Sequence, residues 1–223
     1  MFESKYGKTL TIGLVVLIAI VIGVLIFFTV DYIRNSNINN EASSAVDRFQ
    51  EENRQGRNNQ SDNQNTNQDI QLNILEENVI SSGSTGSDNT FKYKGFPVAG
   101  TIQIPKINLE YPVLEELTKA ALEVSVVKDV GPGLNQIGNT VIVGHDSRNG
   151  VFFSNNKNLS EGDEIYITDK TGTKLKYIIY KIYTTTPEDS SHMERDTKGK
   201  REVTLSTCSD NSKSRLIICA AES

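Results

Sequence analysis

The sequence predicts a mostly β protein: a closed or nearly closed β-barrel with a few short helices, preceded by an N-terminal membrane helix and a disordered tether. Three observations predict this. Residues 11–30 carry no charge, residues 35–69 are rich in Asn and Gln, and residues 97–223 contain many short apolar runs separated by turn residues. Many short strands with few helical stretches are typical of a closed barrel.

The first predicted element is a transmembrane anchor at residues 11–30, after a short cytoplasmic N-terminus at residues 1–10. The segment TIGLVVLIAIVIGVLIFFTV has no charged residue, and as a helix it is about 30 Å long, the thickness of a bilayer's hydrocarbon core. It continues into FFTVDYIRN without the small-residue cleavage site of a signal peptide. Because Lys5 and Lys8 precede it, the positive-inside rule places the N-terminus in the cytoplasm and the rest of the chain outside.

The next segment, residues 31–96, is predicted to be a flexible extracellular tether. Fifteen of the thirty-five residues from 35 to 69 are Asn or Gln. This part buries too little apolar surface to offset the entropy of ordering, although residues 41–54 favour a transient helix. The Gly/Ser-rich stretch SSGSTGSDNT follows. A flexible spacer predicts a folded domain that works at some distance from the bilayer.

The folded domain is predicted to span residues 97–223. AGTIQIPKI and LEYPVLE resemble short strands, and NTVIVGH is a continuous apolar run, which is typical of a strand buried on both faces. GDEIYITDKTGTKLKYIIYKIYTT predicts a hairpin that turns at residues 170–173, with a bulge near Ile178. REVTLSTC and SRLIICAA are the last two predicted strands.

Composition limits the classes of function. The formal net charge is −5 at pH 7, so the chain lacks the basic balance of a nucleic-acid-binding protein. Only two histidines and two cysteines are present, which leaves few candidates for metal ligands. We therefore expect no nucleic-acid partner and no cofactor.

Cys208 is the candidate nucleophile. A cysteine reacts as its thiolate and needs a cationic, partly exposed setting to lower its pKa from about 8.5. Arg215 follows Cys208 by seven positions, so a hairpin loop over residues 209–214 makes the two residues cross-strand neighbours with Cβ atoms roughly 5 Å apart. His145 follows Gly144 at the end of its buried strand, where strands commonly deliver side chains to a cleft. These three side chains form a candidate site.

The same residue types also have structural interpretations. A free cysteine is more often a small buried apolar residue than a nucleophile, and a disulfide is the usual expectation for two cysteines outside the cell. The hairpin argues against a Cys208–Cys219 bridge, because it separates them by about 13 Å, whereas bridged Cα atoms lie within about 7 Å. We therefore expect Cys219 in the core. We expect His192, in the polar loop TPEDSSHMERDTKGK, on the solvated surface.

The motifs around the candidate site resemble those of the sortases, the cysteine transpeptidases that attach surface proteins to bacterial cell walls or link pilin subunits. TLSTC matches the TLxTC signature, NTVIVGH resembles the strand that carries the family's histidine, GVFFSNNKNLSEGDEIYI the segment after it, and SRLIICAA the arginine strand. The resemblance covers about residues 97–223 in the family's order. It implies an eight-stranded β-barrel with Cys208 as nucleophile, His145 as general acid and base, and Arg215 stabilising the substrate and the oxyanion.

Thr207 is a further candidate, because it precedes the nucleophile and is placed to shape a substrate groove. A β-branched residue in a strand needs no function to explain it, so the structural interpretation stays open.

The resemblance also implies an activity, partners and a location. Cys208 would cleave an LPxTG-like sorting motif of a surface protein through a thioester, and an amine from a peptidoglycan cross-bridge or a pilin lysine would accept the acyl group. The N-terminal helix would anchor the enzyme in the membrane of a Gram-positive-type bacterium.

The subclass is open. Compact sortases of class A, D or E fit best, and class B remains an alternative, although the loop at residues 184–200 is short for the helical insertion of that class. Some class A sortases bind calcium through acidic loop residues, and no such site is indicated here.

Two other functions also remain. A cell-wall enzyme of the L,D-transpeptidase type uses a cysteine and a histidine outside the membrane, but its SxGC-like signature is absent around Cys208. The second alternative is a membrane-tethered β-barrel without chemistry, which acts as an adhesin or scaffold.

Overall fold

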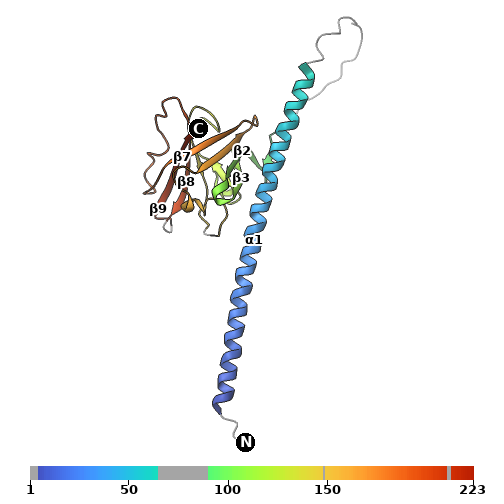
Figure 1. Ribbon diagram of the computed structural model, residues 1–223, viewed down its shortest axis with the longest axis vertical. Helices are drawn as coiled ribbons and strands as arrows, with labels where there is room; N and C mark the ends of the chain where they lie inside the picture. The colour runs from blue at the N-terminus through green and yellow to red at the C-terminus, as the bar shows by residue number, and fades with distance from the viewer. Residues whose placement is uncertain (1–4, 65–89, 148, 210–211) are drawn as a thin grey trace, which may run out of the picture.

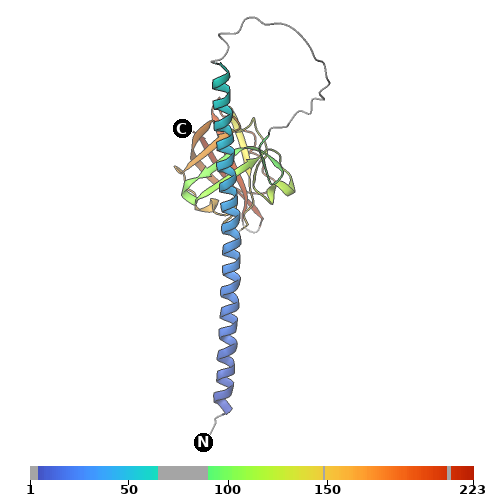
Figure 2. The same ribbon diagram turned by 90° about the vertical axis from the view of Figure 1, so that its right-hand side faces the viewer.

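The computed structural model describes residues 5–64, 90–147, 149–209 and 212–223. One long helix, α1 (Lys5–Gln64), lies against a β-barrel and extends beyond it at both ends (Figure 1). Figure 2 shows α1 crossing one wall of the barrel. The helix therefore covers one face of the barrel and projects far from it on the N-terminal side.

Eight strands close into the barrel, because β2 pairs with both β3 and β6. The pairs β3–β4 and β5–β8 are parallel and the others are antiparallel. The closed eight-stranded barrel that the sequence predicted is confirmed. In order around the ring, the strands are β2 (Phe96–Ile104), β3 (Leu109–Leu114), β4 (Val126–Lys128), β5 (Gly138–Val143), β8 (Arg201–Ser209), β9 (Ser214–Glu222), β7 (Lys174–Thr185) and β6 (Glu164–Asp169).

Short elements connect the strands. A two-residue strand, β1 (Lys92–Tyr93), pairs with β2 outside the ring. The predicted hairpin forms between β6 and β7, with its turn at residues 170–173, and the register shift between Ile179 and Lys181 is the bulge expected near Ile178. The helical connections are η1 (Pro105–Ile107), α2 (Lys119–Leu122) and η2 (Asn156–Asn158).

Branched aliphatic side chains fill the interior of the barrel. Inward-facing positions alternate along a strand, as with Ile102 and Ile104 of β2, both 0% exposed. Ile142 of β5, Leu205 of β8 and Ile218 of β9 are also fully buried and belong to the same cluster. The strands that carry the candidate site are therefore anchored in the main core.

The structure contradicts the flexible tether over residues 31–64, because these residues belong to α1. Four apolar side chains of this part are at most 3% exposed: Ala42, Ala45, Val46 and Phe49. Their i, i+3, i+4, i+7 spacing forms one stripe along a helix, and the barrel covers that stripe. The prediction of a tether was wrong here because it rested on the polar composition of the segment and overlooked the helical spacing of these four apolar residues. The rest of the tether, residues 65–89, lies outside the described residues.

The N-terminal part of α1 is the one described helix long and apolar enough to cross a membrane. Its most apolar window has a mean hydropathy of 3.1 and no buried residue. Between Ile12 and Val30 its large apolar side chains are 47–70% exposed. This segment is compatible with the predicted single-pass anchor.

Gly100 supports the closure of the barrel, since it pairs with Val113 of β3 and Asp169 of β6. A Cβ at Gly100 would lie 2.2 Å from the backbone oxygen of Thr168 and 2.6 Å from Leu134 Cδ1. Gly100→Ala must therefore displace β6. We expect the free energy of unfolding to fall by about 3 kcal/mol, measured by denaturant unfolding.

The control is Gly56→Ala in α1, where a Cβ would meet nothing within 4 Å. This variant should unfold at the wild-type midpoint or above it, because Ala favours a helix over Gly. A wild-type midpoint for Gly100→Ala would contradict the close approach of β2 to β6.

Candidate active site

Cys208 and Arg215 face each other across the β8–β9 hairpin. The strands pair in the register Cys208↔Arg215 and Ser209↔Ser214, and the hydroxyls of Ser209 and Ser214 lie 2.8 Å apart at the end of the ladder. The cross-strand pair predicted from the seven-residue spacing is confirmed. Cys208 is partly exposed, as a nucleophile requires.

Cys219 lies in a different environment. It pairs with Thr204, four pairs along the same ladder from Cys208, and it is 1% exposed. Both cysteines are free thiols. The predictions of a buried Cys219 and of no bridge between the two cysteines are therefore confirmed.

His145 comes to the same end of the barrel through the parallel pairing of β5 with β8. The two strands pair from Gly138↔Arg201 to Val143↔Ser206, a constant offset of 63 residues. The Gly144 N–H donates to the Ser206 carbonyl at 3.2 Å, just beyond the last pair. Extending this offset of 63 residues beyond the last pair predicts that His145 lies beside Cys208.

The imidazole of His145 has an acidic neighbour that the sequence did not indicate. Its Nε2 lies 3.6 Å from Glu123 Oε1, and the side chains are 38% and 64% exposed. Glu123 directly follows α2 as its C-cap. No motif marks this residue, since the contact depends on how the α2 turn packs beside the end of β5.

Thr207 has a different environment from the one predicted. Its side chain is 5% exposed, and its hydroxyl donates to the Gly144 carbonyl at 2.7 Å. Because successive side chains of a strand alternate between faces, Thr207 points away from the face that carries Cys208. We therefore assign Thr207 a positioning contact between β8 and the residue before His145, in place of a substrate contact.

The backbone around His145 is fixed on its other side by Phe153. The Phe153 N–H donates to the His145 carbonyl at 3.1 Å. A Cβ at Gly144 would lie 2.8 Å from the ring of Phe153 and 2.9 Å from Val126. Only glycine allows this close approach, so the residue before the histidine is constrained by packing.

The guanidinium of Arg215 is held by its own hairpin. Its Nη1 donates to the Ser214 carbonyl at 3.2 Å and to the Ser212 carbonyl at 3.4 Å. These are long, partly exposed hydrogen bonds and therefore weak ones. The guanidinium can leave them for a negatively charged oxygen near Cys208 at little cost.

His192 contradicts the prediction of a solvated surface histidine, because it is 3% exposed. Neither ring nitrogen has a hydrogen-bond partner among the described residues. Burial lowers the pKa of His192, which favours the neutral imidazole. The prediction of a surface histidine rested on the polar composition of the loop. The loop is nevertheless held against the barrel, because the side-chain amide of Asn139 in β5 donates to the carbonyls of His192 and Met193, each at 3.0 Å.

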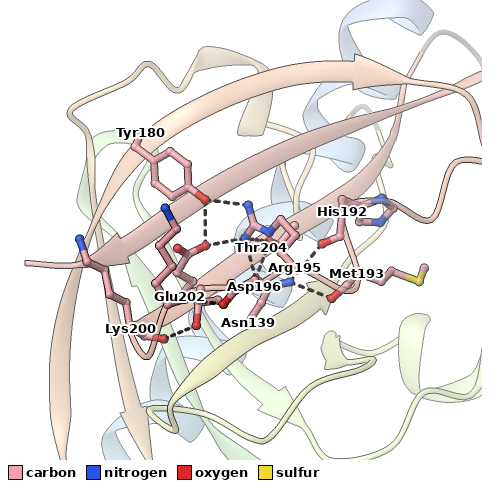
Figure 3. Close-up of polar contacts among 11 residues, drawn as sticks. Asn139, Tyr180, His192, Met193, Arg195, Asp196, Lys200, Glu202 and Thr204 are labelled. Atoms are coloured by element: carbon pink, nitrogen blue, oxygen red, sulfur yellow. Dashed lines mark hydrogen bonds and ion pairs between the residues drawn. The ribbon is translucent and has the colours of Figure 1, made fainter.

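Arg195 holds the same loop to the barrel wall (Figure 3). Its guanidinium donates to Asn139 Oδ1 at 2.8 Å, to Thr204 Oγ1 at 2.9 Å and to the Tyr180 hydroxyl at 2.7 Å, and it pairs with Glu202 at 2.9 Å. In Figure 3 the ring of His192 points away from this cluster. These contacts lie near the starts of β5 and β8, so they support the β7–β8 connection and not the reactive end.

The described residues contain no group of three or more His, Cys, Asp or Glu side chains placed to hold a metal ion. The candidate site accordingly consists of three side chains from three strand ends: a partly exposed thiol, an imidazole and a guanidinium. This set can support nucleophilic attack, proton transfer and stabilisation of an oxyanion.

Comparisons with known proteins agree on one family. The family model described as the sortase domain matches residues 102–223. A curated relative, Sortase A of Bacillus anthracis, is 37% identical over 125 residues, which cover 52% of this chain and 56% of the relative. The chain thus spans just over half the length of that relative.

Solved structures give the same result. Sortase A of Corynebacterium diphtheriae, a lid mutant, superposes with a TM-score of 0.53 at 31% identity, over 57% of this chain and 71% of that one. A Clostridium perfringens Sortase D5 transpeptidase gives a TM-score of 0.52 at 29% identity, over 57% of this chain and 79% of that chain.

The positioning contact of Thr207 is testable by NMR, because the chain has only two histidines. Thr207→Val removes the hydroxyl that binds the Gly144 carbonyl and keeps the side-chain shape. We expect it to shift the ring signals of His145, leave those of His192 in place, and lower the free energy of unfolding by about 1 kcal/mol.

Thr204→Val is the matched control, since this buried hydroxyl donates to Asn139 Oδ1 at 2.7 Å. Thr204→Val should lower the free energy of unfolding by a similar amount. It should shift the ring signals of His192 and leave those of His145 in place. Unchanged His145 signals in Thr207→Val would remove the positioning role.

Proposed function

Because this chain belongs to the sortase family, we propose that it is a membrane-anchored cysteine transpeptidase in which Cys208 is the nucleophile. The observation that carries the proposal is the pairing of Cys208 with Arg215 across the β8–β9 hairpin, with His145 two residues beyond the end of β5, the strand that pairs with β8. The substrate class is an LPxTG-like sorting motif of a surface protein. The products are a cleaved C-terminal fragment and a surface protein joined to an amine of the cell wall.

The first step forms a thioester. The Cys208 thiolate attacks the carbonyl carbon of the scissile peptide bond, and the charge that develops on the carbonyl oxygen is stabilised by Arg215, which stays cationic and offers two donors. The C–N bond then breaks as His145 donates a proton to the departing amine. The acyl group remains on sulfur, and the new amine terminus leaves.

The second step releases the enzyme. An amine from a peptidoglycan cross-bridge or a pilin lysine attacks the thioester carbon, and neutral His145 takes the proton that the amine loses. The C–S bond breaks and the thiolate returns. Each half-reaction uses the same three groups, so the proposed reaction has no need of a cofactor. That the enzyme uses no cofactor stays a prediction.

The proposed location follows from the N-terminal charges. Lys5 and Lys8 precede the apolar part of α1, so we propose that the N-terminus lies in the cytoplasm and the barrel outside the cell membrane of a Gram-positive-type bacterium. A class A, D or E type is the proposed subclass. The sortase match over residues 102–223 includes all three site residues and disfavours the L,D-transpeptidase alternative.

The decisive experiment separates an enzyme from a non-catalytic barrel. The full chain is incubated with a sorting-motif peptide, with and without an added amine. We expect mass spectrometry to find the acyl group on Cys208 without the amine and a transpeptidation product with it. Cys208→Ala should give neither, while Cys219→Ser should retain both.

The kinetic test is Arg215→Lys, which keeps the charge but loses the planar pair of donors. We expect turnover to fall by about 10²-fold or more, with a smaller change in substrate binding. The turnover of His145→Ala should fall at least as far. Near-normal turnover of Arg215→Lys would reduce Arg215 to a source of charge and contradict the oxyanion assignment.

A further inference from the structure

Helix α1 runs along the barrel from the candidate active-site end to the opposite end. At the end of the contact nearer the apolar segment, Asn35 Oδ1 accepts a hydrogen bond from the side-chain amide of Asn149 at 3.1 Å. Asn149 lies four residues after His145 in the chain. At the other end, Arg57 lies over Gly172 in the β6–β7 turn, where an added Cβ would clash with it. The C-terminus, which directly follows β9, lies at one end of the barrel. In Figures 1 and 2 the N-terminal half of α1 leaves the barrel at the opposite end.

The contact between α1 and the barrel is a built interface. Ala45 and Phe49 of the apolar stripe share one buried cluster with Tyr93 of β1, Val98 of β2 and Leu114 of β3. Polar contacts flank the stripe: the Ser43 hydroxyl binds Glu110 at 2.8 Å, the Tyr111 hydroxyl donates to Asn39, and Lys94 pairs with Glu41 at 3.0 Å. This combination fixes the direction of the helix relative to the barrel.

The same helix continues without a break into the apolar segment. Asn35 is five residues beyond Val30, so the contact with the loop after His145 lies about 8 Å along the axis from the end of the apolar surface. The headgroup layer on each side of a bilayer is about 5–8 Å thick. For an α1 that spans a bilayer with its apolar segment, the end of the barrel that carries the candidate site lies at the level of the headgroups.

We propose that α1 is a rigid strut that holds the Cys208 end of the barrel facing the lipid headgroups. The partner of this end is the bilayer surface itself. Lys213 is exposed and Arg215 partly exposed in the β8–β9 hairpin, so both can pair with headgroup phosphates, whereas Glu123 beside His145 carries the opposite charge. The orientation rests on the helix contacts and on the membrane span proposed above, whereas its consequence rests on the proposed chemistry: peptides and amines must reach the site along the membrane surface.

The test measures how close Cys208 lies to the headgroups. The full chain with Cys219→Ser, which leaves Cys208 as its single thiol, is placed in nanodiscs of phosphatidylcholine and phosphatidylglycerol and labelled with a thiol-reactive fluorophore. The quencher is a nitroxide on the lipid headgroup. We expect strong quenching that an equal amount of a water-soluble nitroxide does not reproduce.

Two changes should strongly reduce the quenching for different reasons. Ala45→Glu puts a charge into the docked stripe, where Ala45 is 0% exposed, and should release the helix from the barrel. A 12-residue Gly/Ser insertion between Ile33 and Arg34 leaves the docked face intact but adds a linker of about 20 Å, so quenching should fall about fivefold or more.

Ser44→Glu is the matched control, because it adds the same charge at the neighbouring, exposed position of the helix. It should quench like the parent chain. The strut would be overturned if the parent, Ala45→Glu and the insertion variant were quenched equally. It would also be overturned if the parent showed no quenching.

A second readout separates this proposal from the proposed function. Unlabelled protein in the same discs is assayed for transpeptidation of a short soluble sorting peptide. Quenching without turnover would contradict the proposed chemistry and keep the orientation. Turnover without quenching would keep the chemistry and overturn the orientation.

Discussion

The parallel pairing of β5 with β8 is the constraint on which the proposed site depends. It brings the end of β5, two residues before His145, to the end of β8, two residues before Cys208, and the antiparallel β9 adds Arg215 beside the thiol. A slip of one residue in β8 would turn Cys208 to the other face of the strand. The hydrogen bond from Thr207 to the Gly144 carbonyl opposes such a slip at the reactive end.

Two further interfaces stabilise other parts of the barrel without contributing reactive groups. The cluster around Arg195 and Asn139 binds the β7–β8 connection to the opposite part of the barrel wall. The docked part of α1 covers the β2–β3 side and joins the barrel to the apolar segment. The chemistry and its placement relative to a membrane therefore depend on different contacts, which separate variants can disrupt one at a time.

The sequence predicted the local features of the site and missed those that depend on packing. The seven-residue spacing of Cys208 and Arg215 predicted their pairing, because a short hairpin fixes its own register. The docked face of α1 was hidden in a segment whose average composition is polar, although its period was readable. The burial of His192 and the contact of Glu123 with His145 follow from how a loop and a one-turn helix pack, and no local pattern encodes that.

The central claim is that Cys208, His145 and Arg215 act as one unit, and a double-mutant cycle tests it most directly. We would measure kcat/KM on one sorting peptide for His145→Ala, Arg215→Ala and the double variant. Groups that act together lose their effects non-additively, so the double variant should be about as slow as the slower single variant. Losses that multiply fully would contradict the account, because the two residues would then act independently.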